Sequence, residues 1–325
     1  MAIAAFVSKH RNGKSLGKKR KDLVSLSDVS AAEMLDWFKL AAKLKSEVRK
    51  GKKHPILAGK TLAMIFQKPS TRTRVSFETG MTQLGGHALY LSSHDMQIGR
   101  GETIADTARV LSRYVDAIMA RVFAHADIEG LAQHASVPVI NGLSDFSHPC
   151  QALADYMTIW EKRKKLQGLK LAYLGDGNNV AHSLIYGGAK LGVSVTCVTP
   201  QGYEPSKVVL SNAYRDAAKT GAAIEVTSDL VAGLRGADVL YTDVWASMGQ
   251  ETEHEKRVKI FKPFQLNAQA LAMTGKKDTL VMHCLPAHRG EEITDEVVDG
   301  LNSVVFDQAE NRMHVQKALL VSLLS

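Results

Sequence analysis

The chain has 325 residues, 45% of them hydrophobic and 23% charged, which is enough for two domains with buried cores. No apolar run approaches the roughly 18–20 residues that a membrane helix needs, and residues 1–7 are too few for the apolar part of a secretory signal, so we expect a soluble protein. The net charge of +8 does not indicate a nucleic-acid partner, because residues 1–21 carry seven of these charges and the remainder is close to neutral.

Residues 1–21 form a basic N-terminal extension with seven Lys and Arg residues and no acid. We interpret it as a solvated arm; a transit segment is the alternative, since Lys, Arg and Ser without acids suit that role as well. The three cysteines, Cys150, Cys197 and Cys284, are widely spaced and predict a reducing compartment, not a disulfide framework. We therefore expect a cytoplasmic protein, with the mitochondrial matrix as the alternative if the extension is a transit segment.

The first half of the chain alternates between short β-like runs and helical stretches. Ser30-Ala31-Ala32-Glu33 is a capping box, and the helix that it opens is predicted to stop at Gly51. The β-like runs that follow are residues 61–66, 87–91, 117–121 and 137–140. This alternation predicts a mainly parallel sheet flanked by helices.

A helix over residues 151–165, ending at Gly168, marks the predicted junction between a domain of residues 22–164 and one of residues 165–325. The second half has β-like runs at residues 169–174, 194–198, 223–226, 238–241, 279–282 and 303–306. The fold class that we predict is therefore α/β, with two doubly wound domains.

The segment Ser70-Thr71-Arg72-Thr73-Arg74 lies between the first predicted strand and a helix. The first turn of a helix has unpaired N–H groups and the positive end of the helix dipole, and Arg72 and Arg74 add two guanidiniums. Ser70 is suited to cap the helix. The motif indicates a phosphate site, and the alternative is a capped surface helix with two solvated arginines.

A second group of donors follows later strands of the first half. Arg121 ends a predicted strand, and His148-Pro149-Cys150-Gln151 opens the next long helix. If these strands are neighbours, an Arg, an imidazole and a carboxamide gather where they could polarise a carbonyl and hold an oxyanion. For His148 the alternative is a buried histidine that bonds to the backbone.

The turn Gly175-Asp176-Gly177-Asn178-Asn179-Val180 resembles half of a dinucleotide fingerprint. Val180 replaces the third glycine, and no acidic residue ends the next strand, so we predict no dinucleotide there. Asn179 and backbone N–H groups could hold a carboxylate instead. Asp243 and Ser247-Met248-Gly249 follow another strand and could pair with an ammonium, although this segment alone is also an ordinary turn.

The segment 283–290 contains Cys284 and His288 after a further strand. Neither residue has a partner at the spacing of a zinc motif, so we predict no metal site and no cofactor. We interpret Cys284 as a reactive thiol near a cationic substrate; the alternative is an inert buried thiol. Arg312 adds a cation at the start of the predicted terminal helix.

Taken together, these motifs resemble, in order and spacing from about Leu23 to the C-terminus, those of the ornithine carbamoyltransferases of the aspartate/ornithine carbamoyltransferase superfamily. The resemblance rests on Ser70-Thr71-Arg72-Thr73-Arg74, His148-Pro149-Cys150-Gln151, Asp243 with Ser247-Met248-Gly249, and His283-Cys284-Leu285-Pro286. Aspartate carbamoyltransferases have a similar first motif but an acidic second substrate, which Asp243 would repel.

The resemblance implies roles for individual residues. In a carbamoyltransferase of this kind the site lies in the cleft between the domains, and a terminal helix of about 309–323 packs back on the first domain. Ornithine would be held by Asn179, Asp243, Ser247 and Met248. The catalytic residues would be Arg121, His148, Asp243, Cys284 and Arg312. Carbamoyl phosphate would be bound by Ser70, Thr71, Arg72, Thr73, Arg74, Gln97, Arg121, His148, Pro149, Cys150, Gln151, Cys284, Leu285 and Arg312.

The reaction implied is transfer of the carbamoyl group from carbamoyl phosphate to L-ornithine, giving L-citrulline and phosphate, within arginine biosynthesis and without a cofactor. The resemblance also implies a homotrimer with shared sites, in which Gln97 reaches a neighbour. The alternatives are a carbamoyltransferase for putrescine or an N-acylornithine, a catabolic ornithine carbamoyltransferase, a dinucleotide oxidoreductase, or a non-catalytic binding protein. Neither nucleic acid nor a membrane is expected as a partner.

Overall fold

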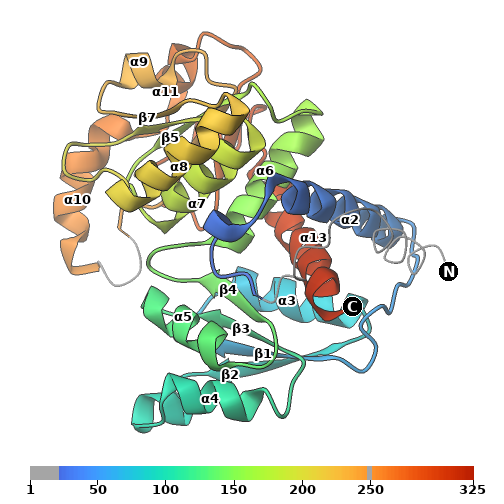
Figure 1. Ribbon diagram of the computed structural model, residues 1–325. Helices are drawn as coiled ribbons and strands as arrows, with labels where there is room; N and C mark the ends of the chain where they lie inside the picture. The colour runs from blue at the N-terminus through green and yellow to red at the C-terminus, as the bar shows by residue number, and fades with distance from the viewer. Residues whose placement is uncertain (1–21, 247–250) are drawn as a thin grey trace.

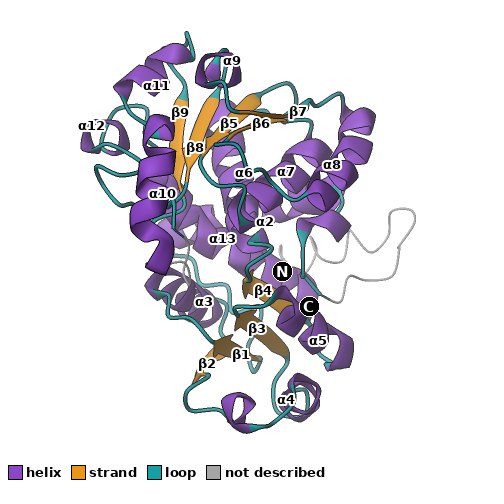
Figure 2. Cartoon of the chain, turned by 90° about the vertical axis from the view of Figure 1, so that its left-hand side faces the viewer, coloured by secondary structure: helices purple, strands orange, loops and turns teal. Residues whose placement is uncertain are grey.

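The computed structural model describes residues 22–246 and 251–325, and within them two parallel sheets lie in separate parts of the molecule (Figures 1 and 2). The first sheet has the strand order β2-β1-β3-β4. Its strands are β1 (Thr61–Phe66), β2 (His87–Ser92), β3 (Ala117–Arg121) and β4 (Val139–Leu143). The chain moves outward from β1 to one edge and from β3 to the other, so the topological switch point lies between β1 and β3.

The second sheet has the order β7-β6-β5-β8-β9, and its neighbouring strands are parallel as well. Its strands are β5 (Lys170–Leu174), β6 (Ser194–Val198), β7 (Ile224–Thr227), β8 (Val239–Thr242) and β9 (Leu280–His283). Here the switch point lies between β5 and β8. The predicted α/β class with two mainly parallel sheets is confirmed.

Helices cover both sheets, and their ends follow the capping signals of the sequence. Ser30 and Glu33 form the predicted capping box at the start of α2 (Ala31–Arg49). Ser70 caps α3 (Thr71–Gln83), and Pro149 occupies the first turn of α6 (Pro149–Arg163). The other α-helices are α4 (Ile104–Leu111), α5 (His125–His134), α7 (Asn179–Leu191), α8 (Lys207–Thr220), α9 (Leu230–Leu234), α10 (His254–Phe261), α11 (Ala268–Met273), α12 (Asp295–Val298) and α13 (Val305–Leu324).

The terminal helix α13 connects the two halves of the molecule. It follows the second sheet and packs against α2, α3 and α6, as Figure 1 shows in red. Trp37 Nε1 donates to Ser322 Oγ at 3.0 Å, and Lys317 Nζ donates to Gln83 Oε1 at 2.7 Å. The largest apolar core therefore runs continuously from the first half into the second.

The predicted strand at residues 303–306 is wrong. Ser303 makes a single parallel bridge to Val281, and α13 begins at Val305. After the bridge, Val304 N donates to Val281 O, and the chain then turns into the helix. Arg312 consequently lies two turns inside α13 and not at its start.

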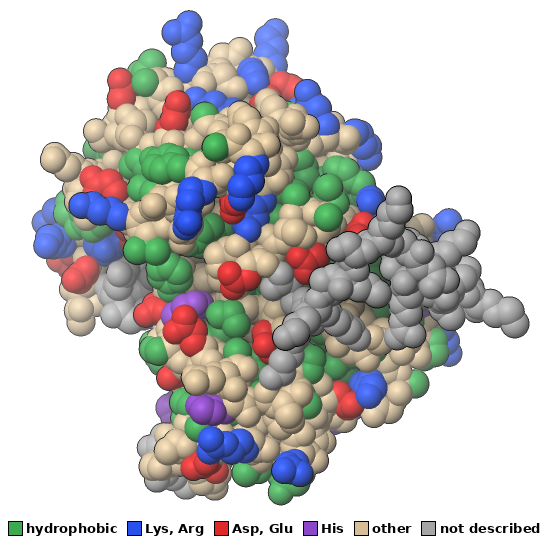
Figure 3. Space-filling view, in the orientation of Figure 1, with side chains coloured by type: hydrophobic (Ala, Val, Ile, Leu, Met, Phe, Trp, Pro, Cys, Tyr) green, Lys and Arg blue, Asp and Glu red, His purple; other side chains and the backbone are tan. Residues whose placement is uncertain are grey.

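The surface agrees with the near-neutral charge of the chain after residue 21. On the face in Figure 3, Lys and Arg side chains are interspersed with Asp and Glu. In the described ranges, no helix is both long enough and apolar enough to cross a membrane.

Candidate active site

The first part of the site lies at the switch point of the first sheet. Arg121 ends β3 directly beside Phe66, the last residue of β1, so the loops after the two strands start side by side. Ser70 Oγ accepts the N–H of Thr73 at 3.3 Å and fixes the first turn of α3. The sheet order thus brings the N-terminus of α3 next to Arg121.

A cluster of three arginines and one histidine surrounds this point, and we call Arg72, Arg121, His148 and Arg312 the cationic cluster. Arg312 Nη2 donates to Thr73 Oγ1 at 2.8 Å, which ties α13 to the first turn of α3. Burial and the neighbouring Arg312 and Arg72 lower the pKa of Arg121 to about 9. Burial, followed by the nearby arginines, holds the pKa of His148 well below its ordinary value, so the imidazole is neutral at pH 7.

The cationic cluster contains buried polar atoms that bond to no described residue. They are Arg72 Nε, Arg312 Nε and His148 Nδ1, and the neighbouring Gln151 Oε1 shares this property. Buried polar atoms normally have partners, because leaving one unpaired costs about 1–3 kcal/mol. Three clustered guanidiniums at a helix N-terminus, two of them with an unpaired Nε, are suited to an anion with several oxygens, such as a phosphate.

Gln151 is held in one orientation by residues beneath it. Its Nε2 donates to Asp155 Oδ1 at 2.8 Å, and Gln308 Nε2 donates to the same oxygen at 2.7 Å. Because the amide nitrogen of Gln151 points to Asp155, its unpaired Oε1 remains an acceptor. Burial raises the pKa of Asp155 to about 7.

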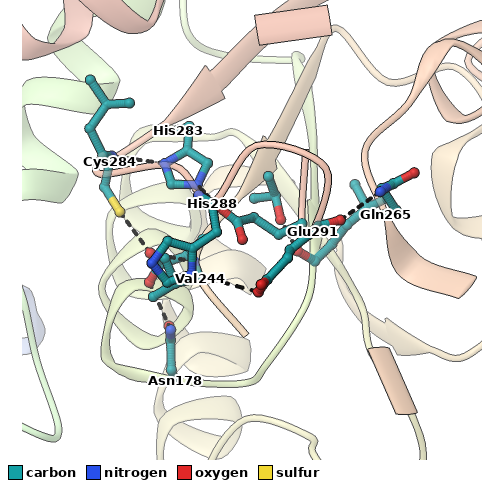
Figure 4. A network of polar contacts seen from close by, with 12 residues as sticks. Asn178, Val244, Gln265, His283, Cys284, His288 and Glu291 are labelled. Carbon is teal, nitrogen blue, oxygen red and sulfur yellow. Dashed lines mark hydrogen bonds and ion pairs between the residues drawn. The ribbon is translucent and has the colours of Figure 1, made fainter. Parts of the chain in front are cut away.

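The second part of the site lies at the switch point of the second sheet, where the loops after β5 and β8 meet. Asn178 Nδ2 donates to Asp243 Oδ2 at 2.8 Å, and Cys284 Sγ donates to Asp243 Oδ1 at 2.9 Å. Figure 4 shows Asn178 and Cys284 pointing toward the same place beside Val244. Asp243 is therefore a buried carboxylate held from two sides by neutral donors.

The prediction of a reactive thiol at Cys284 does not fit this environment. Burial and the adjacent Asp243 carboxylate raise the pKa of Cys284 well above its ordinary value. The thiol keeps its proton and acts as a hydrogen-bond donor.

A hydrogen bond from Arg72 links the two parts of the site. Arg72 Nη2 donates to the carbonyl oxygen of Leu285 at 2.6 Å, and Leu285 follows Cys284. The buried ring of His283 fixes the conformation of this loop. Its Nδ1 accepts the N–H of Leu285 at 2.8 Å, and its Nε2 lies 3.0 Å from Glu292 Oε1. Arg72 therefore joins the cationic cluster to the loop that holds Cys284 against Asp243.

Three of the predicted residues have side chains that are engaged by other parts of the protein or buried in the core. Arg74 is exposed, its Nε donates to Glu78 at 3.0 Å and its guanidinium covers the Tyr90 ring, so it does not join the cationic cluster. Cys150 is buried in the core, where its Sγ donates to Asn141 O at 3.5 Å; burial raises its pKa to about 12, an effect that the nearby Arg312 opposes. Pro149 is buried in the first turn of α6.

The remaining predicted residues lie at the margin. Thr71 and Gln97, which opens the 3₁₀ helix Gln97–Arg100, are exposed. Asn179 Nδ2 donates to Ser144 O at 2.6 Å, which ties the second half to the loop after β4. Ser247 and Met248, which were predicted to hold the second substrate, lie outside the described residues.

The turn that resembles a dinucleotide fingerprint is filled by the protein itself. A Cβ on Gly177 would collide with the backbone of Glu204 and Pro205. Asp176 pairs with Arg257, and Asn178 caps α7 and bonds to Asp243. The glycine is explained by close packing of two loops, and the polar side chains of this turn are engaged by the protein.

Sequence reasoning missed Asp155, Gln308 and Asn178. Asp155 follows Gln151 by one helical turn, a spacing at which two side chains meet on one helix face, so it could have been found. In the sequence, Asn178 stands out only as part of the glycine-rich turn. Gln308 gave no local signal, because its partners lie on other elements.

Comparison with known proteins agrees with this geometry. The family description "Aspartate/ornithine carbamoyltransferase, carbamoyl-P binding domain" matches residues 21–161, and the corresponding "Asp/Orn binding domain" matches residues 167–323. The chain belongs to the aspartate/ornithine carbamoyltransferase family. The predicted family and enzyme class are confirmed.

Individual members of this family are closely similar to the chain. An ornithine carbamoyltransferase of Pyrococcus horikoshii is 62% identical over 306 residues, covering 94% of this chain and 96% of that protein. An anabolic ornithine carbamoyltransferase of Pyrococcus furiosus is 62% identical over 300 residues, covering 92% and 95%. A solved structure of ornithine carbamoyltransferase from the same organism superposes with a TM-score of 0.92 at 60% identity, covering 95% of this chain and 99% of that chain.

Proposed function

We propose that the protein is an ornithine carbamoyltransferase that transfers the carbamoyl group of carbamoyl phosphate to the δ-amine of L-ornithine. The products are L-citrulline and phosphate. The observation that carries the proposal is the pair of hydrogen bonds from Arg72 to Leu285 O and from Cys284 to Asp243. They support the proposal because they link an anion-binding cluster to a buried carboxylate, and a phosphorylated donor and an amino-acid acceptor need such groups close together.

Carbamoyl phosphate would bind with its phosphate at the N-terminus of α3. Ser70, Thr71, Arg72 and Thr73 supply backbone N–H groups, hydroxyls and one guanidinium there, and Arg312 adds a second guanidinium. Arg121 and neutral His148 would donate to the carbamoyl oxygen. Gln151 Oε1 would accept from the carbamoyl NH₂, because its own amide nitrogen is occupied by Asp155.

Ornithine would bind from the opposite side, with its α-ammonium at Asp243. The charge of Asp243 and its fixed geometry between Asn178 and Cys284 support this assignment. Ser247 and Met248 are proposed for the same substrate on the family resemblance, and Asn179 for its carboxylate.

The chemistry is then an attack by the neutral δ-nitrogen on the carbamoyl carbon. A C–N bond forms, the C–O bond to phosphate breaks, and the attacking nitrogen gives up a proton that the departing phosphate can accept. An alkylammonium has a pKa near about 10, so the rate should rise with pH as this group is deprotonated. The protein contributes orientation of two small ions and fixed donors for the developing charge on the carbamoyl and phosphate oxygens.

We also propose a biosynthetic role, a cytoplasmic location and a homotrimeric assembly. The relative from Pyrococcus furiosus that is named anabolic supports the first. The scattered cysteines support the second. The exposed position of Gln97 supports its predicted reach into a neighbouring subunit, and mixing inactive Gln97→Ala and Arg72→Ala proteins should restore part of the activity if sites are shared.

Asp243→Asn tests the acceptor assignment. The substitution keeps the size of the side chain and removes the charge that would pair with the α-ammonium, so KM for ornithine should rise at least about tenfold while carbamoyl phosphate affinity stays within about twofold. Asp106→Asn is the matched control, because Asp106 is exposed on α4 and pairs with Arg109. An unchanged KM for ornithine in Asp243→Asn would contradict the assignment.

A further inference from the structure

Two histidines and a glutamate outside the proposed active site bring their ligand atoms together. His254 Nε2 lies 3.1 Å from Glu291 Oε2, and His288 Nδ1 lies 3.7 Å from the same oxygen. The ligand atoms of all three residues are within 4.8 Å of one another. Figure 4 shows Glu291 extending toward His288 on one side of the network that includes Cys284.

These separations fit a tetrahedral metal centre. Zinc binds histidine nitrogen and carboxylate oxygen at about 2.0–2.2 Å, so two ligands of a tetrahedron are about 3.4 Å apart. The two distances to Glu291 Oε2 lie on either side of this value. Two imidazoles and one carboxylate form a ligand set used by zinc, and the fourth position of such centres is taken by water.

Two of the three ligands are on a loop that is already fixed. His288 N donates to Glu292 Oε1 at 2.6 Å, and the Gln265 side chain donates to Gly290 O and Glu291 O at 2.9 and 2.7 Å. Glu292 in turn faces His283 in the core. Because these bonds hold the backbone, little conformational freedom would be lost when His288 and Glu291 bind an ion.

The third ligand is on a different element. His254 begins α10, and α10 is anchored by Arg257, which bonds to Trp245 O and pairs with Asp176. His254 keeps 39% of its side-chain surface exposed, and His288 keeps 46%, so an ion can reach both. The site is thus formed by two separately anchored segments with an open side.

We propose that His254, His288 and Glu291 form a binding site for one zinc-class divalent transition-metal ion. The spacing of His288 in the sequence predicts no metal ligand, because no zinc-motif partner lies close to it in the chain. The fold supplies that partner from 34 residues earlier in the chain. None of the three residues belongs to the cationic cluster or contacts Asp243 in the contacts described above.

A metal ion at this site would connect two segments of the second domain. His254 lies just after residues 247–250, and His288 lies four residues after Cys284. A bound ion would link the segment that follows β8 to the loop that follows β9. If the proposed function is right, the linked segments are those on either side of the acceptor, and by linkage the ion and the acceptor would change each other's affinity by the same factor.

The test is direct binding of Zn²⁺ to the chelator-treated full-length protein by isothermal titration calorimetry, with Co²⁺ as a spectroscopic probe. We expect one ion per chain, and His254→Ala and His288→Ala should each weaken binding at least about tenfold. Bound Co²⁺ should give visible d–d bands of a nitrogen and oxygen ligand set. The readout is metal binding, so it stands whether or not the protein carbamoylates ornithine.

Two control variants distinguish this site from other metal ligands. His87→Ala removes an exposed histidine from β2 of the first sheet and should leave Zn²⁺ affinity unchanged. Cys284→Ser should also bind Zn²⁺ with the parent affinity. The proposal is overturned if Zn²⁺ does not bind, if His254→Ala and His288→Ala bind as tightly as the parent, or if bound Co²⁺ shows a thiolate charge-transfer band that Cys284→Ser abolishes.

Discussion

Replacement of Arg72 by glutamine gives the sharpest test of the cationic cluster. Arg72 lies in the first turn of α3, donates to Leu285 O at 2.6 Å, and has a buried Nε without a partner among the described residues. Glutamine retains an amide donor but removes the charge and the forked geometry. The variant should therefore bind carbamoyl phosphate more weakly.

The magnitude follows from the loss of one buried charged partner of an anion. Such a loss costs about 2–5 kcal/mol, which corresponds to a dissociation constant raised about 30-fold to a few thousand-fold. At a ligand concentration of about 100 times the parent Kd, the parent gains about 2.7 kcal/mol of stability. With a Kd raised 30-fold, Arg72→Gln would gain about 0.9 kcal/mol or less under the same conditions.

The assay is thermal unfolding of both proteins with and without carbamoyl phosphate. Arg74→Gln is the matched control, because Arg74 is two residues away but pairs with Glu78 and covers the Tyr90 ring. It should keep nearly all of the stabilisation by the ligand. Equal stabilisation of Arg72→Gln and the parent, or an equal loss in both variants, would refute the reasoning.

Two further predictions concern buried groups. Asp155→Leu leaves the Gln151 amide without an acceptor, whereas the Gln308 amide keeps Tyr241 Oη at 3.1 Å. Urea unfolding should therefore show a loss of about 1–3 kcal/mol, and the KM for carbamoyl phosphate should rise. Asp155→Asn retains an acceptor and should restore most of the stability and of the KM. Burial and Lys317 lower the pKa of His314 from 6.5 to about 4. Between pH 6.5 and pH 4 the His314 side chain is therefore protonated mainly in the unfolded chain. The free energy of unfolding consequently falls as the pH drops through that range. Between pH 7.5 and 5 the parent should lose about 2 kcal/mol more than His314→Gln, and equal losses in urea titrations would contradict this.

The sequence predicted the elements of the first sheet well because each strand is a short apolar run bounded by capping or turn residues. Ser30 with Glu33, and Ser70 before α3, are local signals that the structure follows. The error at residues 303–306 has a long-range cause. Ser303 meets Val281 only once before α13 begins, and apolar character alone does not separate a bridge from a strand.

The site was predictable where its chemistry is concentrated in one segment. Arg72 and Thr73 could be proposed from their place between a strand and a helix. Arg74 could not be separated from Arg72 by sequence, because the difference lies in Glu78 and Tyr90, which engage only the second arginine.

Contacts between distant segments could not be predicted from local patterns. Gln308 reaches Asp155 from α13, and His254 reaches Glu291 from α10. Both pairs depend on how whole helices are placed, which periodicity does not determine.

The most direct test of the central claim is a comparison of four amines as carbamoyl acceptors. Purified protein with carbamoyl phosphate would be given L-ornithine, putrescine, N-acetylornithine or aspartate, and the carbamoylated product and released phosphate would be measured together. We predict that ornithine is preferred and that citrulline and phosphate form in equal amounts. Equal or greater turnover with another amine, or no citrulline with ornithine, would contradict the account.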